Sequence, residues 1–232
     1  MNLNHRMLYS LFLLFFITPF QCALSEVLGT KWPTTSTTFL TGGLPLGGPA
    51  GTLPGNTQTW RETAIEAANR WNNAQSTFKL VTSSAAGTGI CNNFGHNNLA
   101  FSSTACSDTF GDNTLAVTAS WSISTTIIKA DIIFNSNKLW GIYDGSILFS
   151  PEDFSRVAMH EMGHAMGLAH TKTSSALMFA TASDTFLPTS DDVDSLKSIY
   201  EEAKQNNGGG STTYLLLLIL VIHLRSAHKK AD

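Results

Sequence analysis

Three histidines and one glutamate lie within HEMGHAMGLAH, residues 160–170, although the chain has only seven histidines among its 232 residues. On a helix, residues four positions apart lie on one face, so His160 and His164 can present imidazole nitrogens to one metal ion. Glu161 follows the first histidine and points beside such an ion, where a carboxylate can take a proton from metal-bound water. The spacing therefore predicts a metal site with a reaction attached to it.

A third histidine completes the predicted ligand set. Gly167 tolerates the positive φ of a sharp helix end, and His170 can then swing back toward the ion. Three neutral histidines and one water form the open tetrahedral zinc site expected where the metal performs chemistry, because a structural site is closed by a fourth protein ligand. A chance grouping of histidines would explain a lone H-x-x-x-H, but not the full H-E-x-x-H-x-x-G-x-x-H pattern.

The element that must position these side chains is a helix predicted over residues 150–167. Ser150 is suited to the N-cap and Pro151 to the first helical position. The acidic residues Glu152 and Asp153 favour the first turn, and a helical apolar period follows them. This prediction places the histidine motif in the C-terminal half of the helix.

Strand-like and helix-like stretches are mixed along the rest of the chain. Alternating or β-branched runs predict strands over residues 37–43, 76–83, 97–103, 113–122 and 125–135. A helical apolar period predicts a helix over residues 56–74, and capping candidates Thr189 and Ser190 begin another over residues 188–205. Residues 83–113 are rich in Gly, Ser, Asn and Thr and are predicted to form a long loop around the strand within them.

The N-terminus has the order of a secretory signal peptide, residues 1–25. Arg6 precedes an apolar run over residues 7–20, and Ala23 and Ser25 supply the small residues of a cleavage site. A membrane anchor is the weaker interpretation, because the run is shorter than the ~20 apolar residues that span a bilayer.

Cleavage after residue 25 removes Cys22 and leaves Cys91 and Cys106, an even pair in an exported chain. A disulfide between them is the expected outcome, and a second zinc site that also includes His96 is the alternative. The formal net charge is -3, and basic residues cluster only at the C-terminus, so no nucleic-acid partner is expected.

The tail, residues 206–232, combines a glycine cluster, an apolar stretch over residues 214–224 and a basic end. Eleven residues as a helix reach only ~16 Å, short of the ~30 Å hydrocarbon core. The tail resembles the GlyGly-type sorting signals of Gram-negative bacterial exported proteins, which implies transient membrane contact and removal of the tail. A retained anchor and a GPI signal are the alternatives.

The extended histidine motif resembles that of the metzincin metallopeptidases, and Met178, eight residues after His170 in SSALM, resembles the Met-turn of the matrixin group. The resemblance implies an α+β catalytic domain over residues 26–205, with a twisted mixed five-stranded sheet and three helices. It further implies zinc held by His160, His164 and His170, with Met178 as the hydrophobic floor under the metal. Met178 as an ordinary core residue is the alternative.

The resemblance extends over most of residues 29–203, and it implies that the strand around residues 113–121 lines the cleft. Substrate-binding main chain is expected at three positions of this edge strand, Leu115, Ala116 and Val117. By the same resemblance, no cysteine-switch propeptide lies between the signal and the first strand.

Several positions depart from the pattern of animal matrixins. Val117 and Ile133 stand where such relatives carry histidines, so a second, structural zinc is not expected. Asn135 and Asn137 replace aspartates that bind calcium there, which leaves structural calcium open. Ala180 replaces the usual proline after the Met-turn.

The sequence thus predicts a monomeric zinc-dependent endopeptidase that is secreted or sorted to the surface of a Gram-negative bacterium and cleaves protein or peptide substrates. Its general base is Glu161. The alternative is a catalytically silent surface binding or adhesion module that retains the metzincin fold. Every catalytic position of the motif is intact, which favours the enzyme.

Overall fold

The computed structural model describes residues 29–201, apart from 49–57, 75, 88, 92–94, 144–145 and 149. The predicted signal peptide and the predicted tail lie outside the described residues. In the part of the chain that is described, no helix is long and apolar enough to cross a membrane.

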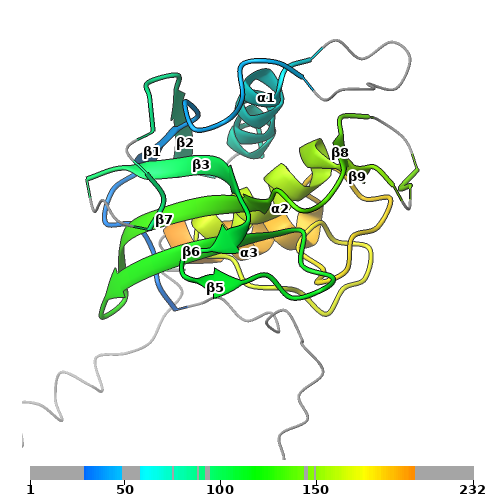
Figure 1. Ribbon diagram of the computed structural model, residues 1–232. Helices are drawn as coiled ribbons and strands as arrows, with labels where there is room; N and C mark the ends of the chain where they lie inside the picture. Colours follow the sequence, from blue (N-terminus) through cyan, green and yellow to red (C-terminus); the bar gives the residue numbers. More distant parts are fainter. Residues whose placement is uncertain are drawn as a thin grey trace, which may run out of the picture. The chain divides into compact units, whose positions relative to one another are not determined.

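A mixed five-stranded sheet forms the frame of the fold, in the order β2-β1-β3-β7-β6 (Figure 1). The neighbouring pairs of β1, β2, β3 and β7 are parallel, whereas β6 runs antiparallel to β7 at one edge. The strands are β1 (Ser36–Leu40), β2 (Lys79–Ser83), β3 (Asn97–Ser102), β6 (Ala116–Ile123) and β7 (Thr126–Asn135). The predicted mixed sheet is confirmed, and the short strand predicted within the long loop is β3.

Two small strand pairs accompany this sheet. An antiparallel pair joins β4 (Thr104–Ala105) to β5 (Asp108–Thr109), and a parallel pair joins β8 (Trp140–Gly141) to β9 (Glu152–Asp153).

Three helices are present among the described residues: α1 (Trp60–Asn72), α2 (Phe154–Ala165) and α3 (Ser190–Tyr200). The predicted α+β class with three helices is confirmed. Small residues on the buried face of α1, such as Ala64 and Ala67, let α1 lie close to α2, and Trp71 Nε1 donates a hydrogen bond to Met159 O at 2.8 Å. This contact joins α1 to the helix that carries the histidines.

The predicted start of the histidine helix is wrong by several residues. The helix begins at Phe154, and its N-cap is Asp153, whose carboxylate accepts the Ser155 N–H at 3.1 Å, not Ser150. The reason is pairing with a distant strand: β9 lies beside β8, and Glu152 N–H donates to Leu139 O at 2.8 Å. At its other end the helix stops at Ala165, and Gly167 adopts a φ of +97° in the predicted sharp turn.

An aromatic cluster anchors the start of α2 on the sheet. Phe154 is fully buried, and its ring centroid lies 4.6 Å from that of Phe134 on β7 and 5.0 Å from that of Trp60 on α1. Because apolar side chains of this size each bury a large area, the cluster fixes where the histidine helix crosses the sheet.

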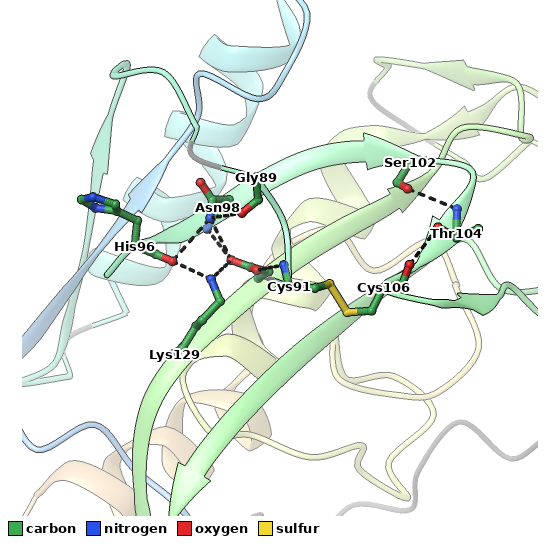
Figure 2. Close-up of a disulfide and its surroundings, with 9 residues drawn as sticks. Gly89, Cys91, His96, Asn98, Ser102, Thr104, Cys106 and Lys129 are labelled. Atoms are coloured by element: carbon green, nitrogen blue, oxygen red, sulfur yellow. Dashed lines mark hydrogen bonds and ion pairs between the residues drawn. A yellow bond between two sulfur atoms is a disulfide. The ribbon is translucent and has the colours of Figure 1, made fainter. Parts of the chain in front are cut away.

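Two kinds of contact hold the long loop: a disulfide within it, which Figure 2 shows, and hydrogen bonds to β7. Cys91 and Cys106 form the predicted disulfide, so the alternative of a zinc site that uses their sulfurs is wrong. Beside the disulfide, the fully buried Lys129 Nζ donates to Asp131 Oδ1 at 2.9 Å and to His96 O at 2.7 Å, and Asp131 Oδ2 accepts the Cys91 N–H at 2.7 Å. A buried charge pair satisfied in this way holds the loop against β7.

Candidate metal centre

The structure brings the three predicted histidines together. The Nε2 atoms of His160, His164 and His170 lie 3.0–3.1 Å from one another. They are the metal-ligand cluster found among the described residues. Two of these side chains come from successive turns of α2, and the third returns from the segment after the turn at Gly167.

Hydrogen bonds at the far side of two rings decide which nitrogen carries the proton. His160 Nδ1 lies 2.8 Å from Leu177 O, and His164 Nδ1 lies 2.8 Å from Leu168 O. A carbonyl oxygen can only accept, so both Nδ1 atoms are protonated and both Nε2 atoms present lone pairs.

Neutral rings are also favoured by the surroundings. Burial, and next the charges of neighbouring histidines, lowers the pKa of His160 and His164 to about 4. Lone pairs that face one another at about 3 Å repel, and a cation between them removes the repulsion. The donor set therefore fits a zinc ion, for which three neutral imidazoles are suitable ligands.

Glu161 lies beside the histidine cluster with only 6% of its surface exposed. Burial raises the pKa of the Glu161 carboxyl. The electrostatic interaction with His160 and the hydrogen bond from Thr118 act in the opposite direction and lower it. Thr118 Oγ1 on the edge strand β6 lies 2.7 Å from Glu161 Oε2. The motif predicted Glu161, but it did not single out Thr118.

The position of Thr118 beside the site could have been predicted from the alternation of side chains along a strand. Ala116 and Thr118 are two positions apart in β6, so their side chains lie on the same face of the sheet. Ala116 is buried in the core on that face, which is the face that α2 covers.

Met178 is 2% exposed and packs against α2. A Cβ atom added to Gly163 would overlap the Met178 sulfur and would lie 3.0 Å from Trp71 Cζ2, so the absence of a side chain at Gly163 is what lets Met178 approach the helix. Thr171 N–H donates to Met178 O at 2.9 Å, which ties the segment after His170 to the predicted Met-turn.

Asp192 on α3 holds this turn in place, a role that its sequence position at a helix N-terminus does not reveal. Asp192 is 1% exposed, and its carboxylate accepts the N–H groups of Leu177 and Met178, each at 3.0 Å. Because Leu177 O in turn accepts the His160 Nδ1–H, the carboxylate indirectly positions the first histidine.

The predicted substrate strand occupies the sheet edge. Ala116 begins β6, and Leu115 precedes it with its carbonyl oxygen accepting the Asn135 N–H at 2.8 Å. Val117 lies directly opposite Ile133 on β7, so the two positions that depart from the histidines of animal matrixins are neighbours in space.

The other departures also have defined surroundings. Asn135 Nδ2 donates to Thr114 O at 2.9 Å, and Asn135 Oδ1 accepts the Asn137 N–H at 3.0 Å, so this amide stabilises the turn after β7. Ala180 is exposed after the Met-turn.

Comparison with known proteins agrees with this fold. The profile of the matrixin family matches residues 52–201, about two thirds of the chain, and the chain therefore belongs to the matrixins, a family of zinc metallopeptidases. The macrophage metalloelastase of rabbit (Oryctolagus cuniculus) is 34% identical over 84 residues, which are 34% of this chain and 17% of that protein. The match thus spans under a fifth of that relative.

Proposed function

We propose that this matrixin is a zinc-dependent endopeptidase with His160, His164 and His170 as the zinc ligands and Glu161 as the general base. The observation that carries the proposal is the convergence of three histidine Nε2 atoms beside a buried carboxylate. A purely structural zinc site has a fourth protein ligand, and no further histidine, cysteine or carboxylate joins this cluster among the described residues.

When bound, zinc supplies Lewis-acid activation of a water and of the scissile carbonyl. The remaining steps belong to the chain. Glu161 accepts the proton that the attacking water loses as its oxygen bonds to the carbonyl carbon. Glu161 then delivers this proton to the amine nitrogen as the C–N bond breaks, so protons balance over the turnover. The low exposure of Glu161 keeps bulk water from competing for the proton.

A peptide substrate would bind in extended form along β6 at the predicted positions Leu115, Ala116 and Val117. The main-chain groups of Ala116 face the open edge, because alternate residues of an antiparallel strand face away from its partner and the Leu115 oxygen already accepts the Asn135 N–H. β6 pairs with β7 on one side and ends the sheet on the other, so an added strand would find unpaired main-chain groups. The main-chain hydrogen bonds would hold the peptide, and pockets for alternate side chains would select the sequence.

The proposal includes export and processing. Residues 1–25 would act as a signal peptide, and residues 206–232 as a tail that is recognised at the membrane and removed, as in Gram-negative bacteria. Mass spectrometry of the exported protein should then find peptides up to the glycines at 208–210 and none from Tyr214 onward. Recovery of peptides that end at Asp232 would favour a retained anchor.

The catalytic proposal is tested with a zinc-loaded protein and a library of quenched fluorescent peptides. Glu161→Gln should keep one bound zinc and lose about 10²- to 10⁴-fold in kcat, because only the proton acceptor is removed. His164→Ala should lose both zinc and activity. Glu201→Gln, an exposed site beyond α3, is the matched control.

The same assay separates the enzyme from the silent binding module. A wild-type protein that binds zinc and cleaves no peptide in the library would favour a surface binding or adhesion module. Wild-type turnover by the Glu161→Gln variant would show that Glu161 is not the base.

A further inference from the structure

We propose that Thr118 is a positioning residue that orients the carboxylate of Glu161 for proton transfer, a role that rests on the proposed peptidase function. The hydroxyl oxygen of Thr118 lies 2.7 Å from Glu161 Oε2 and 2.9 Å from the main-chain oxygen of the same glutamate. The single hydroxyl proton is shared between these two oxygens of Glu161, and the carboxylate oxygen is the closer of the two.

Glu161 needs such a contact because α2 fixes only its main chain. Three rotatable bonds separate the Cα atom from the carboxylate, and freezing them has an entropic cost. The rings of His160 and His164 are oriented by carbonyl oxygens. In the described part of the chain, the Thr118 hydroxyl is the group that hydrogen-bonds the Glu161 carboxylate.

Thr118 is itself held rigidly. In β6 it lies opposite Ile132, which is fully buried on the central part of β7. A β-branched side chain has restricted χ1 freedom in a strand, so the position of the hydroxyl is well determined. With Oε2 engaged by this hydroxyl, Oε1 remains to receive the proton of the attacking water.

The location of Thr118 also relates the base to the substrate. The residue follows directly on Leu115, Ala116 and Val117, the main chain proposed to bind the peptide. The strand β6 would therefore both set the register of the bound peptide and orient the Glu161 carboxylate. One rigid element thus aligns the substrate with the base.

The test uses zinc-loaded Thr118→Val, which keeps the shape of the side chain and removes the hydroxyl, and Thr118→Ser, which restores the hydroxyl. Thr82→Val is the matched control, because Thr82 lies on β2 at the opposite edge of the sheet. For each variant we would measure zinc content, the thermal midpoint, kcat and KM.

We expect Thr118→Val to bind one zinc, to keep its KM within about twofold, and to lose about 10- to 100-fold in kcat, the range for a hydrogen bond to a charged group. Thr118→Ser should recover most of the loss, and Thr82→Val should match the wild type. Unchanged kcat in Thr118→Val, or a loss explained by lower zinc content, would overturn the proposal.

A second measurement does not depend on turnover. It is the coupling between the Thr118 and Glu161 side chains in the stability of the zinc-loaded protein, measured by urea unfolding. In a cycle of Thr118→Val, Glu161→Ala and the double variant, the unfolding constants should deviate from additivity by about tenfold. Strict additivity would overturn the positioning role. An inactive wild type would instead refute the peptidase function, and the cycle would still report on the contact.

Discussion

The carboxylate of Asp192 is expected to control both the stability of the domain and its zinc affinity, and Asp192→Asn tests this. Oδ1 accepts the Met178 N–H at 3.0 Å, whereas Oδ2 accepts the Leu177 N–H at 3.0 Å and both the N–H and the hydroxyl of Thr189 at 2.7 Å. An amide has a single oxygen, so its NH₂ group must face at least one buried N–H donor.

The size of the effect follows from these contacts. With the amide oxygen in the place of Oδ2, the variant loses the bond from Met178 and leaves that N–H group buried without a partner. Loss of one hydrogen bond to a charged group, together with weaker neutral bonds at the other oxygen, lowers the free energy of unfolding by about 3 kcal/mol. For a domain of this length, that is a fall in Tm of about 6–12 °C.

Zinc binding should change in the same variant, because Leu177 O accepts the His160 Nδ1–H. The Leu177 carbonyl is the group that contacts the ligand, and loss of such a contact costs about 10- to 100-fold in metal affinity, so displacement of Leu177 in this variant should lower zinc affinity toward that range. The assay is thermal and urea unfolding in the presence of chelator, followed by competition of zinc against a chromogenic chelator. Asp194→Asn is the control, since Asp194 is an exposed residue on the same helix. An Asp192→Asn protein that unfolds with the Asp194→Asn midpoint and binds zinc equally well would refute the reasoning.

Substitution of three other buried residues, Gly163, Lys129 and Asp153, should change the stability of the domain. Gly163→Ala should lower the free energy of unfolding by about 1–3 kcal/mol, because the added methyl group overlaps Met178, and urea denaturation measures this. Lys129→Met should lower it by about 3–5 kcal/mol, because Asp131 is left as an unpaired buried charge; an effect below 1 kcal/mol by the same method would contradict this. Burial raises the pKa of Asp153 from 3.8 to about 6, so between these values the folded state holds a proton that the unfolded state releases, and this group's contribution to stability falls by about 2 kcal/mol as pH rises from 4 to 6. The difference in unfolding free energy between the wild type and Asp153→Asn should therefore fall over this pH range. Parallel pH profiles of the two proteins would contradict the prediction.

Much of the site was predictable because it depends on local geometry. The spacing of His160 and His164 places both rings on one helix face whatever surrounds the helix, and Gly167 permits the turn that returns His170. The five strands of the main sheet and the three helices were likewise predictable from side-chain periodicity, which reflects the pitch of each element, whereas the short strands β4, β5, β8 and β9 were not predicted. The disulfide between Cys91 and Cys106 followed from the even number of cysteines that remain after the predicted signal peptide.

Other features depend on residues that are distant in the sequence. The helix signals at Ser150 and Pro151 are sound locally, but pairing of β9 with β8 delays the helix to Phe154. Asp192 resembles an ordinary residue of a helix N-terminus, and only the fold places its carboxylate on the Met-turn.

The sequence by itself therefore determined the main helices and strands, the three histidines and the glutamate, because helix pitch, strand alternation and turn chemistry act over a few residues, and the resemblance to the metzincins supplied the class of the fold. Only the tertiary structure decided which groups orient these side chains: Thr118 on Glu161, Leu177 O on His160, and Asp192 behind Leu177. Their hydrogen bonds join elements whose proximity results from packing of the whole core, and no local pattern encodes the distance between them.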